Sequence, residues 1–227
     1  FSQTTKGNIS PSDSLGALVN QDANDTLKLI HLNELAWELM YQNVDTSVLL
    51  NNLAIELGEE LIKNEVSGSV RKMIHRELAI ANSQLGTCYR LKGDYPQSIY
   101  SHLKALEIRK EIADKKGILA SFYNIGSVYY SQGDYPLALE YYFKALLISK
   151  ELGDNESMAF VLSNIGLVYR QQKDFKMGLD YFSKALHISK ANGNKNSMVL
   201  AFINIGNVYY DQKDFSKAIG QYFDALQ

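Results

Sequence analysis

The residue types that most often carry catalysis or bind metals are few and scattered in this sequence. The four histidines, His31, His75, His102 and His187, show no metal-ligand spacing. Cys88 has no histidine nearby in the sequence and falls on a segment with a packed helical pattern, which favours an inert buried thiol over a nucleophile. No phosphate-binding glycine pattern occurs. We therefore predict no catalytic residue, no metal site and no cofactor, and hence a protein that is not an enzyme.

Amide side chains, in contrast, recur at one position of a repeated motif. Asn124, Asn164 and Asn204 each precede an Ile-Gly pair, and Gln84 precedes Leu-Gly. Successive copies are forty residues apart, and each is followed by an aspartate and an aromatic residue. A fixed period between about 20 and 50 residues is typical of a protein built from stacked repeats, so this period decides the fold.

Each repeat is predicted to form two helices joined by a tight turn. An aspartate in every turn can accept hydrogen bonds from the N–H groups that begin the second helix. A glycine lies in the middle of each first helix, where it costs about 1 kcal/mol relative to alanine, so we expect it to allow close approach of the second helix. The glycines are Gly86, Gly126, Gly166 and Gly206, and the rings expected beside them are His102, Tyr142, Phe182 and Tyr222.

The repeats account for most of the chain. We expect an all-α solenoid of antiparallel helix hairpins over residues 25–227, in about five units. Their ranges are 25–64, 70–113, 117–153, 156–193 and 197–227, the last of them truncated. The first unit diverges from the others, as terminal repeats often do because one side meets water. Within it, residues 35–39 align with residues 165–169.

Residues 1–24 are predicted to form a polar N-terminal arm with one short helix. A capping signal at residues 11–14 precedes Leu15, Leu18 and Val19, which have helical spacing. These three side chains either cover the exposed face of the first repeat or place the arm in a groove, its own or a neighbour's. In the second case the arm imitates a ligand and could mediate self-association.

Composition and charge narrow the choice of partners. The 227 residues are 46% hydrophobic, and a formal net charge of −2 with a pI near 6.1 gives no electrostatic footprint for nucleic acid or anionic lipid. No apolar run approaches the roughly 20 residues of a membrane-spanning helix. The localisation stays open between two alternatives. If Phe1 follows a removed signal peptide, the protein is expected to be periplasmic or extracytoplasmic; otherwise it is expected to be cytoplasmic.

The repeated motif resembles the tetratricopeptide repeat, in which Leu-Gly-x-x-Tyr is followed by small, aromatic and alanine positions. Residues 25–227 follow this pattern with a period of forty rather than about 34 residues. Lys110, Lys150 and Lys190 stand where the family commonly has proline. The resemblance implies a right-handed superhelix whose concave wall is lined by the first helix of each unit, with a peptide or protein segment bound there.

The same resemblance assigns candidate ligand contacts to the concave wall. In peptide-bound relatives the amide before Ile-Gly contacts the ligand backbone, and a carboxamide, with two donors and one acceptor, suits an extended chain of any sequence. The amides could instead hydrogen-bond within the helix stack. Two arginines could bind a partner carboxylate, and three tyrosines could supply contact area. The complete set is Gln84, Asn124, Asn164, Asn204, Tyr123, Tyr130, Arg90, Arg170, Asn207 and Tyr210.

Positions one helical turn from the amides are expected on the same wall. The positions one turn before the amides are Ile80, Ala120, Phe160 and Leu200, and those one turn after them are Thr87, Ser127, Leu167 and Asn207. We therefore expect a non-catalytic scaffold that binds a peptide or protein segment. Its long-period repeat looks like the sensor regions of bacterial signalling proteins. The alternative is a structural adaptor whose groove or N-terminal arm mediates self-association.

Overall fold

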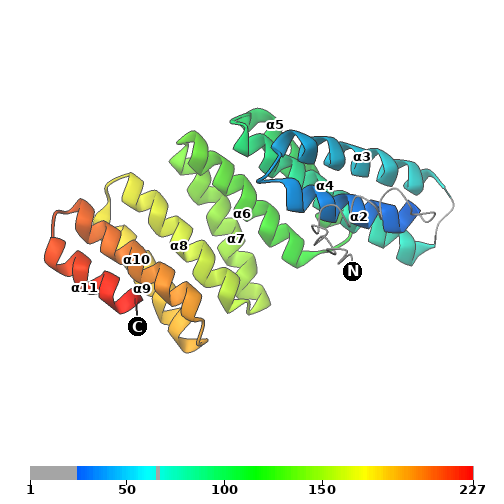
Figure 1. Ribbon diagram of the computed structural model, residues 1–227. Coiled ribbons are helices and arrows are strands. Elements are labelled where there is room, and N and C mark those ends of the chain that lie inside the picture. Colours follow the sequence, from blue (N-terminus) through cyan, green and yellow to red (C-terminus); the bar gives the residue numbers. More distant parts are fainter. Residues whose placement is uncertain (1–24, 65–66, 227) are drawn as a thin grey trace, which may run out of the picture. The chain divides into compact units, whose positions relative to one another are not determined.

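The computed structural model describes residues 25–64 and 67–226, and nearly all of these are helical. Ten α-helices, α2 to α11, follow one another in these ranges without an intervening strand (Figure 1). The predicted all-α class is therefore confirmed. The expected N-terminal arm, with Leu15, Leu18 and Val19, lies outside the described residues. None of the described helices has both the length and the apolar character needed to cross a membrane.

The helices form two compact units, which divide in sequence between Asp114 and Lys115. The first unit contains α2 (Asp25–Leu39), α3 (Val44–Lys63), α4 (Gly68–Leu91) and α5 (Tyr95–Glu111). The second contains α6 (Lys115–Gln132), α7 (Tyr135–Leu152), α8 (Asn155–Gln171), α9 (Phe175–Ala191), α10 (Lys195–Asp211) and α11 (Phe215–Ala225). In the second unit consecutive helices pair as α6–α7, α8–α9 and α10–α11, and each later hairpin packs on the one before it.

The turns inside the hairpins form as their aspartates predict. Asp134 Oδ1 accepts a hydrogen bond from the Leu137 backbone N–H at 3.1 Å, and Asp174 Oδ1 accepts one from Met177 at 3.0 Å. Asp94 and Asp214 cap α5 and α11 in the same way. Because such a cap contributes about 1 kcal/mol, the turns fix where each second helix begins.

The mid-helix glycines hold each hairpin together by close contact. A Cβ placed on Gly166 would lie 2.7 Å from Cε1 of Phe182, and one on Gly206 would lie 2.5 Å from Cε1 of Tyr222. A Cβ placed on Gly86 or on Gly126 would likewise lie 2.8 Å from the ring of His102 or of Tyr142, respectively. The expected pairing of glycine with a ring is therefore confirmed in every hairpin that carries it. This contact sets the orientation of the first helix about its axis, and hence the direction in which residues opposite the glycine point.

Candidate functional site

Three of the predicted amides lie on the first helices of the second unit. Asn124, Asn164 and Asn204 stand on α6, α8 and α10 and are each partly exposed. Residues two apart on a helix point about 200° apart, so each amide lies opposite the glycine that contacts the second helix. We call the surface formed by these sides of α6, α8 and α10 the amide wall. Figure 1 shows α8 (yellow) and α10 (orange) running side by side along it.

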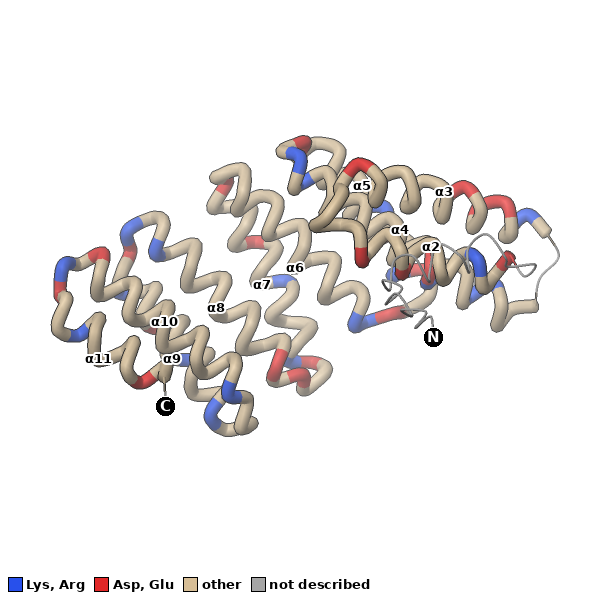
Figure 2. The backbone as a smooth tube through the Cα atoms, in the orientation of Figure 1, with Lys and Arg blue, Asp and Glu red and all other residues tan. Residues whose placement is uncertain are grey.

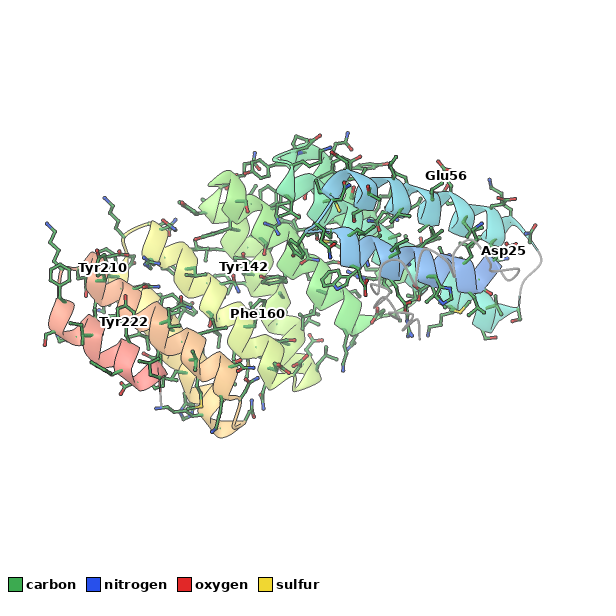
Figure 3. The ribbon with its side chains drawn as sticks, in the orientation of Figure 1. Asp25, Glu56, Tyr142, Phe160, Tyr210 and Tyr222 are labelled. Carbon is green, nitrogen blue, oxygen red and sulfur yellow. The ribbon has the colours of Figure 1, made fainter. Side chains whose placement is uncertain are left out.

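Aromatic and polar contacts join α6 to α8 on the amide wall. The ring of Tyr123 lies 4.9 Å from the ring of Phe160, measured between centroids. Phe160 is labelled on α8 in Figure 3. Farther along the same helices, Gln171 Nε2 donates a hydrogen bond to Tyr130 Oη at 3.2 Å. Both predicted tyrosines therefore contact the neighbouring repeat, and both keep part of their surface exposed.

A hollow of about 220 Å³ opens between α8 and α10 and brings two of the amides together. Asn164 and Asn204 both line it. Asn164 Nδ2 donates to the Phe160 carbonyl oxygen at 2.9 Å, which uses one of the two N–H donors of that carboxamide. The full lining is Ala159, Phe160, Ser163, Asn164, Leu167, Ser197, Leu200 and Asn204.

The apolar part of this hollow is open to solvent. The side chain of Phe160 is 48% exposed and that of Leu200 is 52% exposed. Their places one turn from the amides were predicted from helical spacing, whereas Ser163 and Ser197 were missed. Ser197 lies seven residues before Asn204, so the two-turn spacing would have found it. The hollow can accept an apolar side chain while amides lie within reach of the backbone that carries it.

The amide wall carries no charge in its middle. Between residues 157 and 169 of α8, and between 196 and 210 of α10, the sequence contains no Lys, Arg, Asp or Glu. Figure 2 shows the charged residues of these two helices at their ends. The chemistry available at the hollow is therefore hydrogen bonding and apolar contact rather than ion pairing.

A second hollow, of about 480 Å³, lies at the C-terminal ends of α8 and α10 and is lined by Arg170, Gln171, Lys173, Phe175 and Asp211. Arg170 Nε donates to Asp211 Oδ2 at 2.6 Å. The predicted role of Arg170 as a carboxylate binder thus requires a ligand to compete with an internal carboxylate. The repeat pattern does not reveal this partner, because Asp211 lies 41 residues away on the next first helix.

Two further candidate residues on α10 contact side chains of α11. Asn207 Oδ1 accepts a hydrogen bond from Tyr222 Oη at 2.9 Å. The Tyr210 ring is 58% exposed and lies 5.5 Å from the ring of Phe215, measured between centroids. Asn207 therefore supports the packing of α11 on α10, whereas Tyr210 keeps most of its surface available.

The remaining candidates, Gln84 and Arg90, belong to α4 in the first unit. Gln84 is only 9% exposed, and its Oε1 has no hydrogen-bond partner among the described residues. Arg90 is partly exposed. The expected fourth amide is thus largely buried, unlike those of Asn164 and Asn204, and the amide wall consists of residues of the second unit alone.

The described residues offer little for catalysis. They contain no group of three or more His, Cys, Asp or Glu side chains that could hold a metal ion. Cys88 is buried with its Sγ 3.2 Å from Ser47 Oγ. Burial raises the pKa of the Cys88 thiol, which disfavours the reactive thiolate. The amide wall therefore holds the most developed candidate site.

The sequence profile described as Tetratricopeptide repeat matches residues 77–154 and 157–227, which together exceed half of the chain. The chain therefore belongs to the tetratricopeptide repeat family. No curated protein matches it in sequence.

Solved structures share the fold at low sequence identity. BtubC from P. vanneervenii aligns with a TM-score of 0.73 and 20% identity over 95% of this chain and 85% of its own. Aspartyl phosphate phosphatase F from Bacillus subtilis aligns with a TM-score of 0.70 and 16% identity, over 95% of this chain and 63% of its own. The Rap conjugation gene regulator of plasmid pLS20, in complex with the Phr* peptide, aligns with a TM-score of 0.69 and 17% identity, over 100% of this chain and 57% of its own. These likenesses confirm the solenoid of helix hairpins.

Proposed function

We propose that the protein is a non-catalytic scaffold whose amide wall holds an extended peptide or protein segment. The hollow between α8 and α10 carries this proposal, because it places the amides of Asn164 and Asn204 beside the exposed side chains of Phe160 and Leu200. An apolar ligand side chain enters the hollow while the ligand backbone hydrogen-bonds to the amides. The peptide bound to the pLS20 regulator supports this use of the fold.

Selection from a library of random peptides displayed on phage tests the proposal. We expect enriched sequences to share an apolar residue within an otherwise tolerant segment, and synthetic peptides of those sequences to bind in isothermal titration calorimetry. A library that yields no saturable binder would contradict the scaffold function. A phosphatase shares the fold, so hydrolysis of acetyl phosphate by the purified protein would contradict the proposal that this scaffold is non-catalytic.

Replacing both Asn164 and Asn204 by alanine is expected to weaken binding of the selected peptide about tenfold. Each lost hydrogen bond contributes about 0.5–1.5 kcal/mol, and about 1.4 kcal/mol corresponds to a factor of ten. The thermal unfolding midpoint should remain close to that of the parent protein, because both side chains are partly exposed. Calorimetry gives the affinity and circular dichroism gives the midpoint.

The matched control is Gln97→Ala, which removes an exposed amide from α5 in the first unit and should leave the affinity unchanged. A large loss of stability in the double variant, with unchanged peptide affinity, would show instead that these amides hold the helix stack together.

We further propose that the scaffold is the sensor region of a larger bacterial signalling protein. The gene regulator that shares the fold supports this context, and the chain spans 57% of that regulator's length. Ligand capture across α6, α8 and α10 would change the stacking of the hairpins and so transmit the signal. Spin labels at Lys116→Cys and Lys195→Cys, on α6 and α10, should report a changed distance when the peptide binds. An unchanged distance distribution at saturation would contradict the sensor role.

A further inference from the structure

A third hollow, of about 250 Å³, lies where α8 and α10 begin and α9 ends. Ala159 and Ser197 line both this hollow and the one that brings Asn164 and Asn204 together, so the two hollows meet at these residues. We call the third one the polar hollow, because amide and carboxylate side chains contribute to its lining: Asn155, Glu156, Asn192 and Asn194.

The charge in the lining of the polar hollow comes from Glu156. Other carboxylates on α7, α9 and α10 pair with a lysine or an arginine: Glu140 with Lys144, Glu151 with Lys115, Asp180 with Lys184 and Asp211 with Arg170. Within residues 25–64 and 67–226, Glu156 has no such ion pair, and its Oε1 accepts a hydrogen bond from Asn194 Nδ2 at 3.3 Å. That distance lies beyond the usual range for N–H···O hydrogen bonds, so the carboxylate keeps most of its capacity to bind a cation.

The amides beside this carboxylate add further acceptor oxygens. Asn192 Oδ1 accepts a hydrogen bond from Asn155 Nδ2 at 3.3 Å, and a carbonyl oxygen can accept a second one. Guanidinium and ammonium groups carry only donors, and an arginine can use several of them at once. The polar hollow therefore suits a cationic side chain better than a neutral or an acidic one.

The repeat period shows that the fold does not require a glutamate at this place. Because successive copies are forty residues apart, the position of Glu156 is occupied in the other repeats by Arg76, Lys116 and Asn196. The carboxylate is thus particular to the repeat that begins with α8. Since Lys116 stands at the equivalent place on α6, a lysine at position 156 is also compatible with the fold.

The polar hollow lies within reach of a ligand side chain near the apolar one. Glu156 and Phe160 are four residues apart on α8, which corresponds to about 6 Å along the helix axis. Residues two apart in an extended chain point to the same side. The long stem of a lysine or an arginine can therefore run toward Glu156 while the apolar side chain lies beside Phe160.

We propose that the segment held on the amide wall carries an arginine or a lysine two positions from its apolar residue, and that Glu156 binds this positive charge. This inference rests on the proposed function and specifies its ligand: a basic and apolar segment rather than an acidic one. Glu156 is exposed, so the ion pair contributes more to selectivity than to overall affinity.

Variants of one peptide provide the test. The tightest binder from the random-peptide selection is resynthesised with an acetylated N-terminus, and arginine, citrulline or glutamate is placed two positions before or after its apolar residue. Citrulline has nearly the shape of arginine but no charge. Fluorescence anisotropy at low salt should show that arginine binds about three- to fivefold more tightly than citrulline at one of these positions, and that glutamate binds more weakly than citrulline. These differences should vanish at 1 M salt, where the Debye length is about 3 Å.

Changes at position 156 assign the preference to its carboxylate. Glu156→Gln should abolish the preference for arginine over citrulline and leave the affinity for the citrulline peptide unchanged. Glu156→Lys should reverse the order, so that the glutamate peptide binds more tightly than the arginine peptide. The matched control, Glu140→Gln, removes an exposed carboxylate from α7 and should preserve the preference. Circular dichroism should give the same thermal unfolding midpoint for the Glu156 variants as for the parent protein.

The outcomes separate this inference from the proposed function. Equal affinity for the arginine and citrulline peptides at both positions would overturn the inference and leave the scaffold function standing, because the peptides still bind. A preference for arginine that survives in Glu156→Gln would also overturn it. A selection that yields no saturable binder would contradict the proposed function, and this inference with it.

Discussion

Replacing Gly166 by leucine is expected to lower the free energy of unfolding by about 1–3 kcal/mol, or more if α9 cannot shift. The first added atom would already lie 2.7 Å from Cε1 and 2.8 Å from Cδ1 of Phe182. That ring is fully buried, so it has no free space into which to move. Urea unfolding followed by circular dichroism measures the loss. The same variant should keep its affinity for the peptide, because Gly166 faces away from the amide wall.

Gly220→Ala is a matched control for which a change of opposite sign in the free energy of unfolding is expected. Gly220 also lies within a helix, α11, but a Cβ added there meets no atom within 4 Å. Gly220→Ala should therefore stabilise the protein by up to about 1 kcal/mol through helix propensity alone. Equal gains from Gly166→Ala and Gly220→Ala would show that close contact with Phe182 is not what retains glycine at position 166.

Acidification is expected to destabilise the protein through His102. Burial of the imidazole beside Gly86 lowers the pKa of His102 to about 3, and the positive charges of Arg109 and Arg90 act in the same direction. Its Nδ1 has no hydrogen-bond partner among the described residues that could stabilise a bound proton. The folded protein therefore keeps this ring neutral where an exposed histidine would be charged.

The sign of the pH dependence follows from proton uptake. The unfolded chain binds a proton at His102 below a pKa of about 6.5, whereas the folded protein does so only near 3. Stability from this residue is complete above pH 6.5 and falls between pH 6.5 and 3 by about 1.4 kcal/mol per pH unit. Unfolding in urea at pH 7, 6 and 5 should show a loss of about 2 kcal/mol at pH 5.

His102→Phe should remove this slope without opening a cavity. Phe182 occupies the equivalent position opposite Gly166, so the fold already accommodates a phenyl ring there. His187→Phe changes an exposed histidine on α9 and should leave the slope intact. A slope that persists in His102→Phe would assign the acid sensitivity to other groups.

The repeat period predicted which side of each helix a residue occupies, but not which partner its side chain finds. The contact between Gly206 and Tyr222 could be predicted because it lies within one hairpin and recurs with the period. The pairing of Arg170 with Asp211 could not be predicted, since it joins successive repeats through long, flexible side chains. Likewise, the period placed Gln84 in line with the asparagines, whereas the burial of its side chain depends on tertiary packing that the period does not specify.

The presence of one amide on each first helix of the second unit has a consequence for the length of the proposed ligand. Helices packed side by side have axes about 8–10 Å apart, and an extended chain advances about 3.3–3.6 Å per residue. The amides of Asn124, Asn164 and Asn204 would therefore meet about every second or third residue of a segment that crosses α6, α8 and α10. The three amides would then span about five to seven residues of the ligand, and each additional hairpin would add about two or three.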